Sequence, residues 1–192
     1  MSAQHYNREQ RREMLEIAAQ SIRYGLQYDA PPRIDISGLD PALQAPRASF
    51  VTLKEQGRLR GCIGSLVAYR PLALDVNDNA FNAAFRDPRF PPLSADELPL
   101  IDIHISVLSP PEPMHFVDEA DLLAQIRPGV DGLILEDRGQ RGTFLPSVWE
   151  ELPDPVEFLR HLKLKAGLPP DWWSDTLKVE RYTTEEFSAA DL

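Results

Sequence analysis

The sequence predicts an α+β protein in which a mixed or antiparallel sheet is flanked by helices. Three observations support this class. Apolar residues recur at helical spacing in several segments. Short runs of β-branched and aromatic residues lie between these segments, and two pairs of runs are joined by tight glycine turns, which is typical of antiparallel hairpins. Proline-rich stretches separate the remaining elements.

The composition is that of an ordinary globular protein. The chain has 192 residues, enough for one compact domain, with 43% hydrophobic and 26% charged residues. The amino end is polar and helical and no apolar run reaches roughly 18 residues, so we expect neither a membrane span nor secretion. Cys62 is the single cysteine, which excludes an internal disulfide and fits a cytoplasmic location. The sequence contains no metal-ligand cluster or phosphate loop, so no metal and no cofactor are predicted.

The charge pattern limits the class of ligand. A net charge of −10 argues against non-specific binding of nucleic acid, because such binding depends on clustered Lys and Arg. Four of the 20 basic residues are lysines and the other 16 are arginines. The planar fork of arginine grips carboxylate or phosphate at two points, so paired arginines suit an anionic small-molecule ligand, unless they reflect compositional bias alone. The close pairs are Arg58 and Arg60, Arg86 and Arg89, and Arg138 and Arg141.

The first helix is expected to begin after Asn7 and to end before Pro31-Pro32. Asn7 supplies an acceptor for free N–H groups, and Gln10 completes a capping box three positions later. One apolar stripe at helical spacing follows, formed by Leu15, Ala18, Ile22 and Leu26. The connector that runs on to Arg47 is predicted to be extended and to carry no chemistry.

A hairpin is expected next, with strands at residues 48–55 and 58–64 and a turn at Gln56-Gly57. The two-residue period of a strand places Arg60 and Cys62 on one face. The cross-strand neighbours expected for a two-residue turn are Val51 for Cys62 and Leu53 for Arg60.

Glycines flank the cysteine of this hairpin. Gly61 and Gly64 inside a strand indicate a bulge, or a position where a backbone or a ligand approaches closely. Because Cys62 lies between them and two residues after an arginine, it is the first candidate for a reactive centre.

A helix opening at Pro71 is predicted to bury a stripe of small residues against the sheet. The following loop, residues 86–93, is expected to be rigid because it contains three prolines in five positions. Ser94 with Glu97 indicates a capping box and predicts a short helix through Leu98.

Residues 101–108 are predicted to form a strand with Asp102, His104 and Ser106 on its polar face. The order Asp, His, Ser suggests a catalytic triad, but the geometry of a strand opposes one. Alternate residues stand roughly 6.6 Å apart and point in parallel, whereas triad side chains converge to about 3 Å. His104 is therefore either a hydrogen-bonded structural residue or a lone base.

The second half of the chain contains a helix at 118–126, a hairpin with strands at 132–136 and 141–145, and a closing strand at 176–183. Between them, Asp154-Pro155-Val156-Glu157 combines an N-cap, an N1 proline and an N3 glutamate, which predicts another helix start.

Five motifs occur in an order that resembles a known family. They are Leu59-Arg60-Gly61-Cys62-Ile63-Gly64, Phe85-Arg86-Asp87-Pro88-Arg89-Phe90-Pro91-Pro92-Leu93, Ile105-Ser106-Val107-Leu108-Ser109-Pro110, Gly142-Thr143-Phe144-Leu145-Pro146-Ser147-Val148-Trp149-Glu150, and Phe158-Leu159-Arg160-His161-Leu162 with Lys165-Ala166-Gly167-Leu168. Together they resemble the AmmeMemoRadiSam system protein A family, related to the animal AMME-syndrome candidate protein, from about residue 10 to about residue 187.

The resemblance implies a single domain of two lobes around a cleft, with the larger lobe built from both chain ends and the smaller lobe from a middle segment. It also implies a three-part system with a Memo-like protein and a radical S-adenosylmethionine (SAM) protein as partners. The family's motif cysteine falls on Cys62 and its arginine on Arg60. The resemblance implies no known reaction.

Cys62 is the predicted catalytic residue. The predicted substrate-binding residues lie beside it, in the resembling motifs or on the polar face of the strand at 101–108. They are Arg60, Gly61, Gly64, Arg86, Asp87, Arg89, Phe90, His104, Ser106, Trp149 and Glu150.

Functions of different classes remain open. In the first, an enzyme uses Cys62 as a nucleophile or acid–base group, with Arg60 favouring the thiolate and the arginine pairs holding an anionic substrate. In the second, Cys62 only packs, and the chain is a non-catalytic ligand-binding or adaptor subunit for the Memo-like and radical SAM proteins. A third hypothesis, action on RNA through Arg86, Arg89 and Phe90, is opposed by the acidic charge balance.

Overall fold

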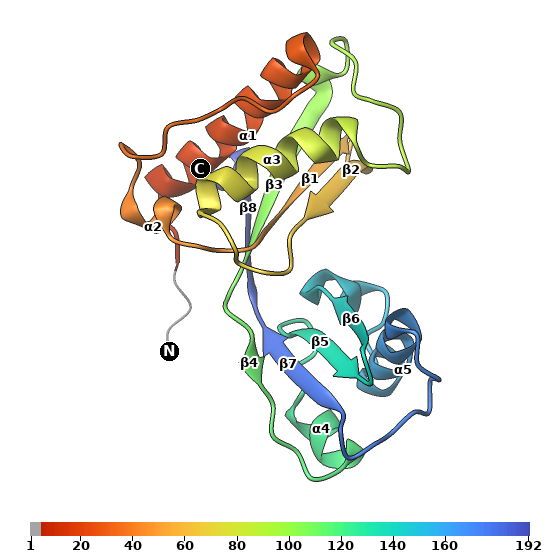
Figure 1. The fold of residues 1–192 in the computed structure, drawn as a ribbon. Helices are drawn as coiled ribbons and strands as arrows, with labels where there is room; N and C mark the ends of the chain where they lie inside the picture. Colours follow the sequence, from red (N-terminus) through yellow and green to blue (C-terminus); the bar gives the residue numbers. More distant parts are fainter. Residues whose placement is uncertain (1–4) are drawn as a thin grey trace. The chain divides into compact units, whose positions relative to one another are not determined.

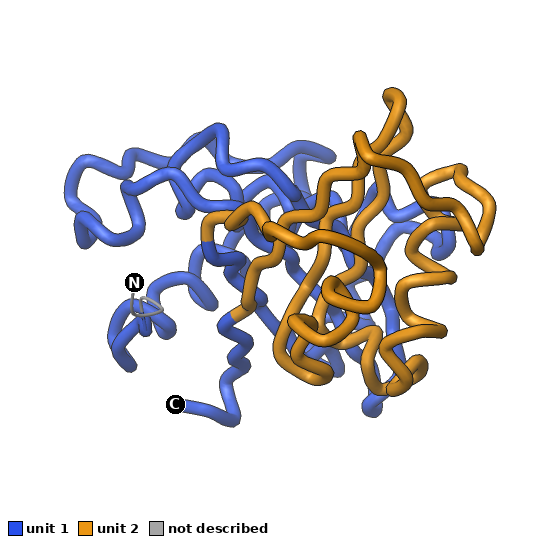
Figure 2. The backbone as a smooth tube through the Cα atoms, turned by 90° about the horizontal axis from the view of Figure 1, so that it is seen from below, with its two compact units in different colours: residues 1–109, 185–192 blue, residues 110–184 orange. Residues whose placement is uncertain are grey.

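The structure is a computed structural model that describes residues 5–192, so the first four residues of the predicted polar amino end lie outside it. The chain divides into two compact units (Figure 2). Each unit has its own sheet and hydrophobic core. Unit 1 comprises residues 5–109 and Glu185–Leu192, and unit 2 comprises Pro110–Thr184. The α+β class with antiparallel sheets is confirmed.

Unit 1 is a two-layer arrangement of helices on a four-stranded antiparallel sheet (Figure 1). The order of strands in the sheet is β2-β1-β3-β8, so β2 is an edge strand. The elements are α1 (Arg8–Tyr28), α2 (Pro41–Gln44), β1 (Ser49–Glu55), β2 (Arg58–Gly64), α3 (Leu72–Phe85), β3 (Ile101–Leu108) and β8 (Thr184–Ser188), with 3₁₀ turns at Leu98–Leu100 and Ala189–Asp191.

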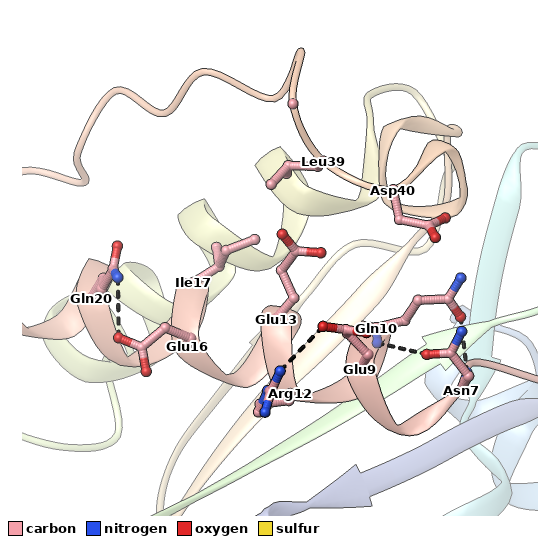
Figure 3. A pocket seen from close by; sticks show the side chains of 11 residues that line it. Asn7, Glu9, Gln10, Arg12, Glu13, Glu16, Ile17, Gln20, Leu39 and Asp40 are labelled. Carbon is pink, nitrogen blue, oxygen red and sulfur yellow. Dashed lines mark hydrogen bonds and ion pairs between the residues drawn. The ribbon is translucent and has the colours of Figure 1, made fainter.

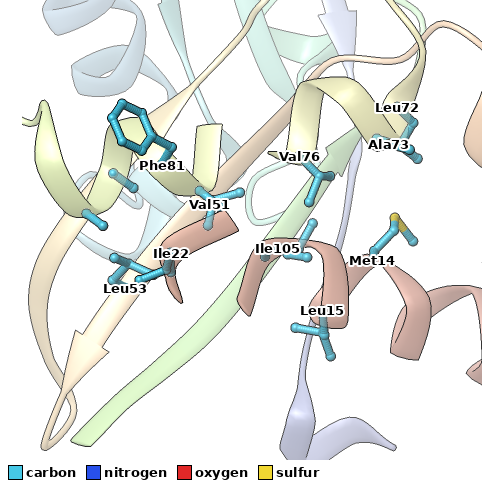
Figure 4. Packing of buried hydrophobic residues seen from close by; sticks show 14 of the residues in the cluster. Met14, Leu15, Ile22, Val51, Leu53, Leu72, Ala73, Val76, Phe81 and Ile105 are labelled. Atoms are coloured by element: carbon cyan, nitrogen blue, oxygen red, sulfur yellow. The ribbon is translucent and has the colours of Figure 1, made fainter. Parts of the chain in front are cut away.

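The core of unit 1 lies between α1, α3 and one face of the sheet (Figure 4). Met14, Leu15 and Ile22 from α1 pack with Val51 and Leu53 from β1, and further side chains come from α3 and β3. Burying several large aliphatic side chains contributes about 1.5–3 kcal/mol for each. This packing decides which face of each strand points away from the helices.

The predicted capping box of α1 is confirmed. Asn7 accepts from the Gln10 N–H, and Gln10 Oε1 accepts from the Asn7 N–H, both at 2.9 Å. The helix ends at Asp29, which adopts a left-handed conformation before the two prolines.

The predicted hairpin of β1 and β2 is present, but its predicted register is wrong. Thr52, not Val51, lies opposite Cys62, and Leu53 lies opposite Gly61. The pairing then resumes between Lys54 and Leu59, so Arg60 is an extra residue in a β-bulge. One extra residue exchanges the faces of a strand on one side of the bulge, because side chains alternate with a period of two.

A buried polar network joins the ends of the hairpin to α3. Asp75 of α3 accepts hydrogen bonds from the Ser49 N–H at 2.8 Å and the Ser49 hydroxyl at 2.6 Å. It also accepts from Asn79, Ser65 and Arg70, at 2.8–2.9 Å. Because the Asp75 side chain is fully buried, this number of donors offsets its desolvation and fixes β1 and the loop after β2 against the helix.

Unit 2 contains a second antiparallel sheet, ordered β4-β7-β5-β6. Its elements are β4 (Glu112–Pro113), α4 (Glu119–Gln125), β5 (Gly132–Asp137), β6 (Gln140–Phe144), α5 (Pro155–Ala166) and β7 (Lys178–Tyr182), with a 3₁₀ turn at Pro146–Glu150. The predicted start of α5 is confirmed, since Asp154 accepts from the N–H groups of Val156 and Glu157.

Some elements differ from the expectation. The short helix expected after Ser94 is a single 3₁₀ turn at Leu98–Leu100, although Glu97 does accept from the Ser94 N–H and hydroxyl. The predicted closing strand is β7 alone, and a further strand, β8, continues from it into the sheet of unit 1. In the described part of the chain, none of the helices has the length and apolar character needed to span a bilayer.

Candidate functional site

Cys62 lies on the sheet face that points away from the core of unit 1. Its opposite neighbour, Thr52, donates a hydrogen bond from Oγ1 to the Cys62 Sγ at 3.2 Å. Thr52 alternates with the fully buried Val51 and Leu53, so its side chain and the thiol share the face that α1 and α3 do not cover. The thiol is unpaired and half-buried.

His104 belongs to the same row. Thr52 lies opposite Cys62 on one side and opposite His104 of β3 on the other, so the three residues cross three strands in the order Cys62, Thr52, His104. Neighbouring strands are about 4.8 Å apart, which puts the cysteine and histidine backbones about 9.6 Å apart. Thr52 therefore stands between them, and His104 is not a direct partner of the thiol.

The adjacent row contains two more predicted residues. Phe50 lies opposite Gly64 on β2 and opposite Ser106 on β3. A Cβ at Gly64 would lie 2.2 Å from the Phe50 ring, so the missing side chain makes room for that ring. Gly64 is thus explained by packing, while Ser106 shares the face of Cys62.

The loop after α3 clamps the backbone of Cys62. The outward-facing N–H of Cys62 donates to Asp87 Oδ2 at 2.9 Å, and its C=O accepts from Arg89 Nη2 at 3.2 Å. Arg89 also binds Asp87 through Nη2 at 2.7 Å and Nε at 3.0 Å. Together these two side chains occupy the unpaired edge of β2, which otherwise would be open to another strand.

The ion pair between Asp87 and Arg89 stabilises this arrangement around the Cys62 backbone. The hydrogen bonds from the Arg89 side chain lower the pKa of Asp87 far below its usual range, with smaller contributions from the N–H groups of Cys62 and Arg89. Burial of the Asp87 carboxylate, whose side chain is 2% exposed, opposes this shift but does not outweigh it. Asp87 is therefore an anion that acts on the peptide group of Cys62.

Arg60 of the bulge is buried and has an acidic partner. Its guanidinium donates to Glu97 through Nε at 2.6 Å and Nη2 at 3.2 Å, and to the Pro91 carbonyl at 3.0 Å. The Phe90 ring centroid lies 5.9 Å from its Cζ. The hydrogen bond from Arg60 is the main reason that the pKa of Glu97 falls to about 2.

Gly61 is required by helix packing. A Cβ at this position would lie 2.1 Å from the carbonyl oxygen of Ala83 in α3, closer than any ordinary contact. The close approach predicted for this glycine is therefore the approach of a helix backbone.

The remaining predicted arginine also has an acidic partner. Arg86 Nη2 donates to Asp29 at 2.9 Å, and its Cζ lies 5.2 Å from the Phe81 ring centroid. The three arginines of the predicted substrate-binding set, Arg60, Arg86 and Arg89, are thus each paired with a carboxylate in this structure.

Trp149 and Glu150 lie in unit 2. Trp149 is stacked on Phe158 with ring centroids 3.7 Å apart, and its Nε1 donates to the Asp131 carbonyl at 2.7 Å. These contacts make Trp149 part of the core of unit 2, whereas Glu150 is exposed.

Sequence reasoning missed Thr52 as a neighbour of the thiol. The miss follows from the register, since the bulge at Arg60 exchanges Val51 for Thr52. Gly61 was the available signal, because glycine within a strand marks bulges. Within residues 5–192, no group of three or more His, Cys, Asp or Glu side chains is arranged to hold a metal ion.

The protein is thus of the α+β class and has two units. The strand that carries Cys62 is held at its edge by Asp87 and Arg89 of the loop after α3. The AMMECR1 family model matches residues 15–187, and the chain belongs to this family.

Relatives from archaea are similar over nearly the whole length. A Methanothermobacter thermautotrophicus protein is 40% identical over 183 residues, covering 94% of this chain and 95% of the relative. A Methanocaldococcus jannaschii protein is 36% identical over 185 residues, covering 92% of each. The crystal structure of the uncharacterized protein PH0010 from Pyrococcus horikoshii is similar with a TM-score of 0.81 and 34% identity, covering 91% of this chain and 89% of that one.

Proposed function

We propose that the chain is a thiol-dependent enzyme in which Cys62 is the nucleophile or proton-transfer group. The observation that carries this proposal is the hydrogen bond from Thr52 Oγ1 to the half-buried sulfur, at 3.2 Å, on the sheet face that the helices of unit 1 leave uncovered. A donor stabilises a thiolate more than a thiol, because hydrogen bonds to ionised acceptors are roughly twice as strong as neutral ones. The nucleophile in such chemistry is the thiolate.

The clamp on the Cys62 backbone supports the proposal. Asp87 and Arg89 hold the N–H and C=O of this residue, and the bulge and Gly61 hold the strand against α3. A reactive group on a rigid strand is positioned more accurately than one on a loop. These residues act by positioning Cys62.

An anionic substrate at Cys62 would contact groups other than Arg60, Arg86 and Arg89, which already bind carboxylates. Lys54 is two residues from Thr52 on β1 and therefore shares its face, where it lies opposite Asp102 of β3. His104 lies on the same face. We propose Lys54 as the group that would attract an anion to the thiol, in place of Arg60, Arg86 and Arg89, and the His104 imidazole as a hydrogen-bonding partner for the substrate.

The test is an untargeted comparison of small molecules and modified macromolecules among a wild-type strain, a deletion strain and strains carrying Cys62→Ala or Cys62→Ser. Both variants should reproduce the changes of the deletion strain while the protein is present at its normal level. If both variants resemble the wild type, the thiol is not required.

The second candidate is a non-catalytic binding subunit, with the Memo-like and radical SAM proteins as proposed partners in the cytoplasm. The engagement of Arg60, Arg86 and Arg89 by carboxylates favours it, because the motif then serves as an internal scaffold. Copurification with the two partners decides between the functions. A stable complex together with normal pathway output in the Cys62→Ala strain would support the binding subunit over the enzyme.

A further inference from the structure

Two surface features of unit 1 differ in what they offer a ligand. A groove runs along α1, between this helix and the connector that leads to α2 (Figure 3). Its carboxylates at Glu9 and Glu16 pair with arginines of the same helix, so these ion pairs close within α1 and select no ligand. The sheet face that carries Cys62 is different, because an aromatic ring lies beside the thiol.

The ring of Phe50 lies flat on the backbone of β2 at Gly64. A Cβ on Gly64 would lie 2.2, 2.3 and 2.6 Å from the Cγ, Cδ1 and Cδ2 atoms of this ring. Three adjacent ring atoms at nearly equal distances mean that the Cβ would meet the face of the ring, since an approach from the edge would bring only two atoms so close. Glycine at this position therefore lets the ring cover the strand backbone, as aromatic residues do beside glycines in other sheets.

The opposite face of the Phe50 ring points away from the sheet. Ser49 and Val51, its neighbours along β1, are fully buried toward the helices, so the period of the strand places Phe50 on the uncovered face. Phe50 is half-buried and belongs to neither hydrophobic core. Within residues 5–192 it takes part in no ring–ring or cation–π contact. The second face of the ring is therefore free to stack on a ligand.

The ring and the thiol are neighbours along the strands. Gly64 and Cys62 are two residues apart on the same face of β2, which separates them by about 6.6 Å. The same spacing separates Phe50, Thr52 and Lys54 along β1. A molecule that lies along these strands would contact the ring first, then the thiol with its Thr52 donor, and then Lys54.

A polar group lies beside the ring. Ser106 of β3 is the cross-strand neighbour of Phe50, and its hydroxyl forms no hydrogen bond with any residue that the structure describes. A hydroxyl is both a donor and an acceptor, so Ser106 can bind a heteroatom of a ring that is stacked on Phe50.

We infer that the substrate of Cys62 carries an aromatic ring that stacks on Phe50, with its electrophilic atom about 6.6 Å from this ring, at the thiol, and its anionic group toward Lys54. An aromatic pair is favourable beyond the apolar area that it buries, so Phe50 selects a flat ring over a saturated one. Phe50 acts as a positioning residue. The inference rests on the function proposed for Cys62, because the ring fixes where the electrophile meets the sulfur.

Alkylation by two matched chloroacetamides tests the inference. N-benzyl-2-chloroacetamide carries a flat ring, and N-(cyclohexylmethyl)-2-chloroacetamide carries a saturated ring of the same size at the same distance from the reactive carbon. With both reagents the Cys62 thiolate forms a carbon–sulfur bond and chloride leaves with the electron pair. After correction for the rates of the two reagents with glutathione, the native wild type should react about fivefold faster with the benzyl reagent.

Variants of Phe50 separate stacking from general apolar contact. Phe50→Leu removes the ring and keeps an apolar side chain, so the ratio of the benzyl to the cyclohexylmethyl rate should fall to about 1. Tyr28→Leu removes an exposed ring at the end of α1 and should leave the ratio unchanged. If Phe50→Leu has a lower melting temperature than the wild type, Phe50→Trp replaces it, and its wider ring should raise the ratio. A ratio in Phe50→Trp below that of the wild type overturns the inference.

Iodoacetamide carries no ring and reports on the thiol alone. If the native chain reacts with iodoacetamide no faster than the unfolded chain but keeps the benzyl preference, the function proposed for Cys62 fails and the ring site stands. If the iodoacetamide reaction is fast but the ratio of the two chloroacetamide rates is about 1, or is the same in Phe50→Leu as in the wild type, the ring site is overturned and the proposed function stands.

The kind of ring is read from a third reagent, N-(pyridin-3-ylmethyl)-2-chloroacetamide. A faster reaction than with the benzyl reagent, lost in Ser106→Ala, supports a heteroaromatic ring held by the Ser106 hydroxyl. Equal rates with the two flat reagents, both above the cyclohexylmethyl rate, support a carbocyclic ring.

Discussion

Replacing Gly61 with alanine should destabilise unit 1 more than any other single-methyl change on β2. The added Cβ would lie 2.1 Å from the Ala83 carbonyl oxygen and 3.0 Å from its carbon. The obstacle is helix backbone, which cannot rotate away as a side chain can, so either α3 or the bulge must move by about 1 Å. Overpacking typically costs about 1–3 kcal/mol, and we expect the upper end here.

The assay must report on unit 1. All three tryptophans, Trp149, Trp172 and Trp173, lie in unit 2, so tryptophan fluorescence follows that unit alone. Urea unfolding of unit 1 is therefore followed by hydrogen exchange at the amides of α1 and α3. A loss of about 3 kcal/mol corresponds to a fall of about 6–12 °C in melting temperature for a chain of this size.

A matched control is available in the same unit. A methyl group at Gly38 would meet no neighbouring atom within 4 Å, and this glycine has no positive φ, so Gly38→Ala should change the free energy of unfolding by less than about 1 kcal/mol. The reasoning is refuted if Gly61→Ala and Gly38→Ala are equally stable. That result would mean that the distance between Gly61 of β2 and the Ala83 carbonyl of α3 is large enough to hold a methyl group.

Two further predictions concern ion pairs. The pKa of Glu97 is lowered to about 2, so its pairing with Arg60 stabilises unit 1 above the ordinary glutamate pKa of about 4.5 and is lost as the pH falls toward 2. Glu97→Gln should therefore flatten the pH dependence of unit 1 stability between about 4.5 and 2, and an unchanged acid-unfolding profile would contradict this. In unit 2, fully buried Lys163 binds Glu119 at 2.6 Å, so Glu119→Ala should destabilise the unit by about 1–3 kcal/mol, whereas Lys163→Met should be nearly neutral. Tryptophan fluorescence measures both, because Trp173 lies 5.7 Å from the Lys163 Nζ, and equal losses in both variants would show that the reasoning is wrong.

Local signals in the sequence predicted most of the elements. The caps at Asn7 and Asp154, the two hairpins and the strand at 101–108 follow from the chemistry of neighbouring residues, and all are present. β8 was missed because it follows β7 after a single residue, Thr183, without a turn signal. A strand that passes from one sheet to another has no local signature.

The sequence predicted the strand that carries Cys62 but not the neighbours of this residue. The hairpin placed Cys62 correctly on β2, yet the bulge at Arg60 changed its neighbour to Thr52. The roles of the arginines could not be read from spacing, because Glu97 lies 37 residues from Arg60 along the chain. Such partners are brought together only by the fold, so the sequence has no local signal for the carboxylate that binds Arg60.

The rate of Cys62 alkylation tests the central claim most directly, since the single cysteine makes the signal unambiguous. Iodoacetamide modification is followed at pH 7 for the wild type, Thr52→Val and Thr52→Ser, with the same chains unfolded in urea as the reference. If the Thr52 hydroxyl supports a reactive thiolate, the native wild type reacts faster than its unfolded chain, Thr52→Val lowers the native rate about tenfold, and Thr52→Ser restores it. Equal native rates in all three proteins, below the rate of the unfolded chain, would contradict the claim and leave Cys62 as a packing residue.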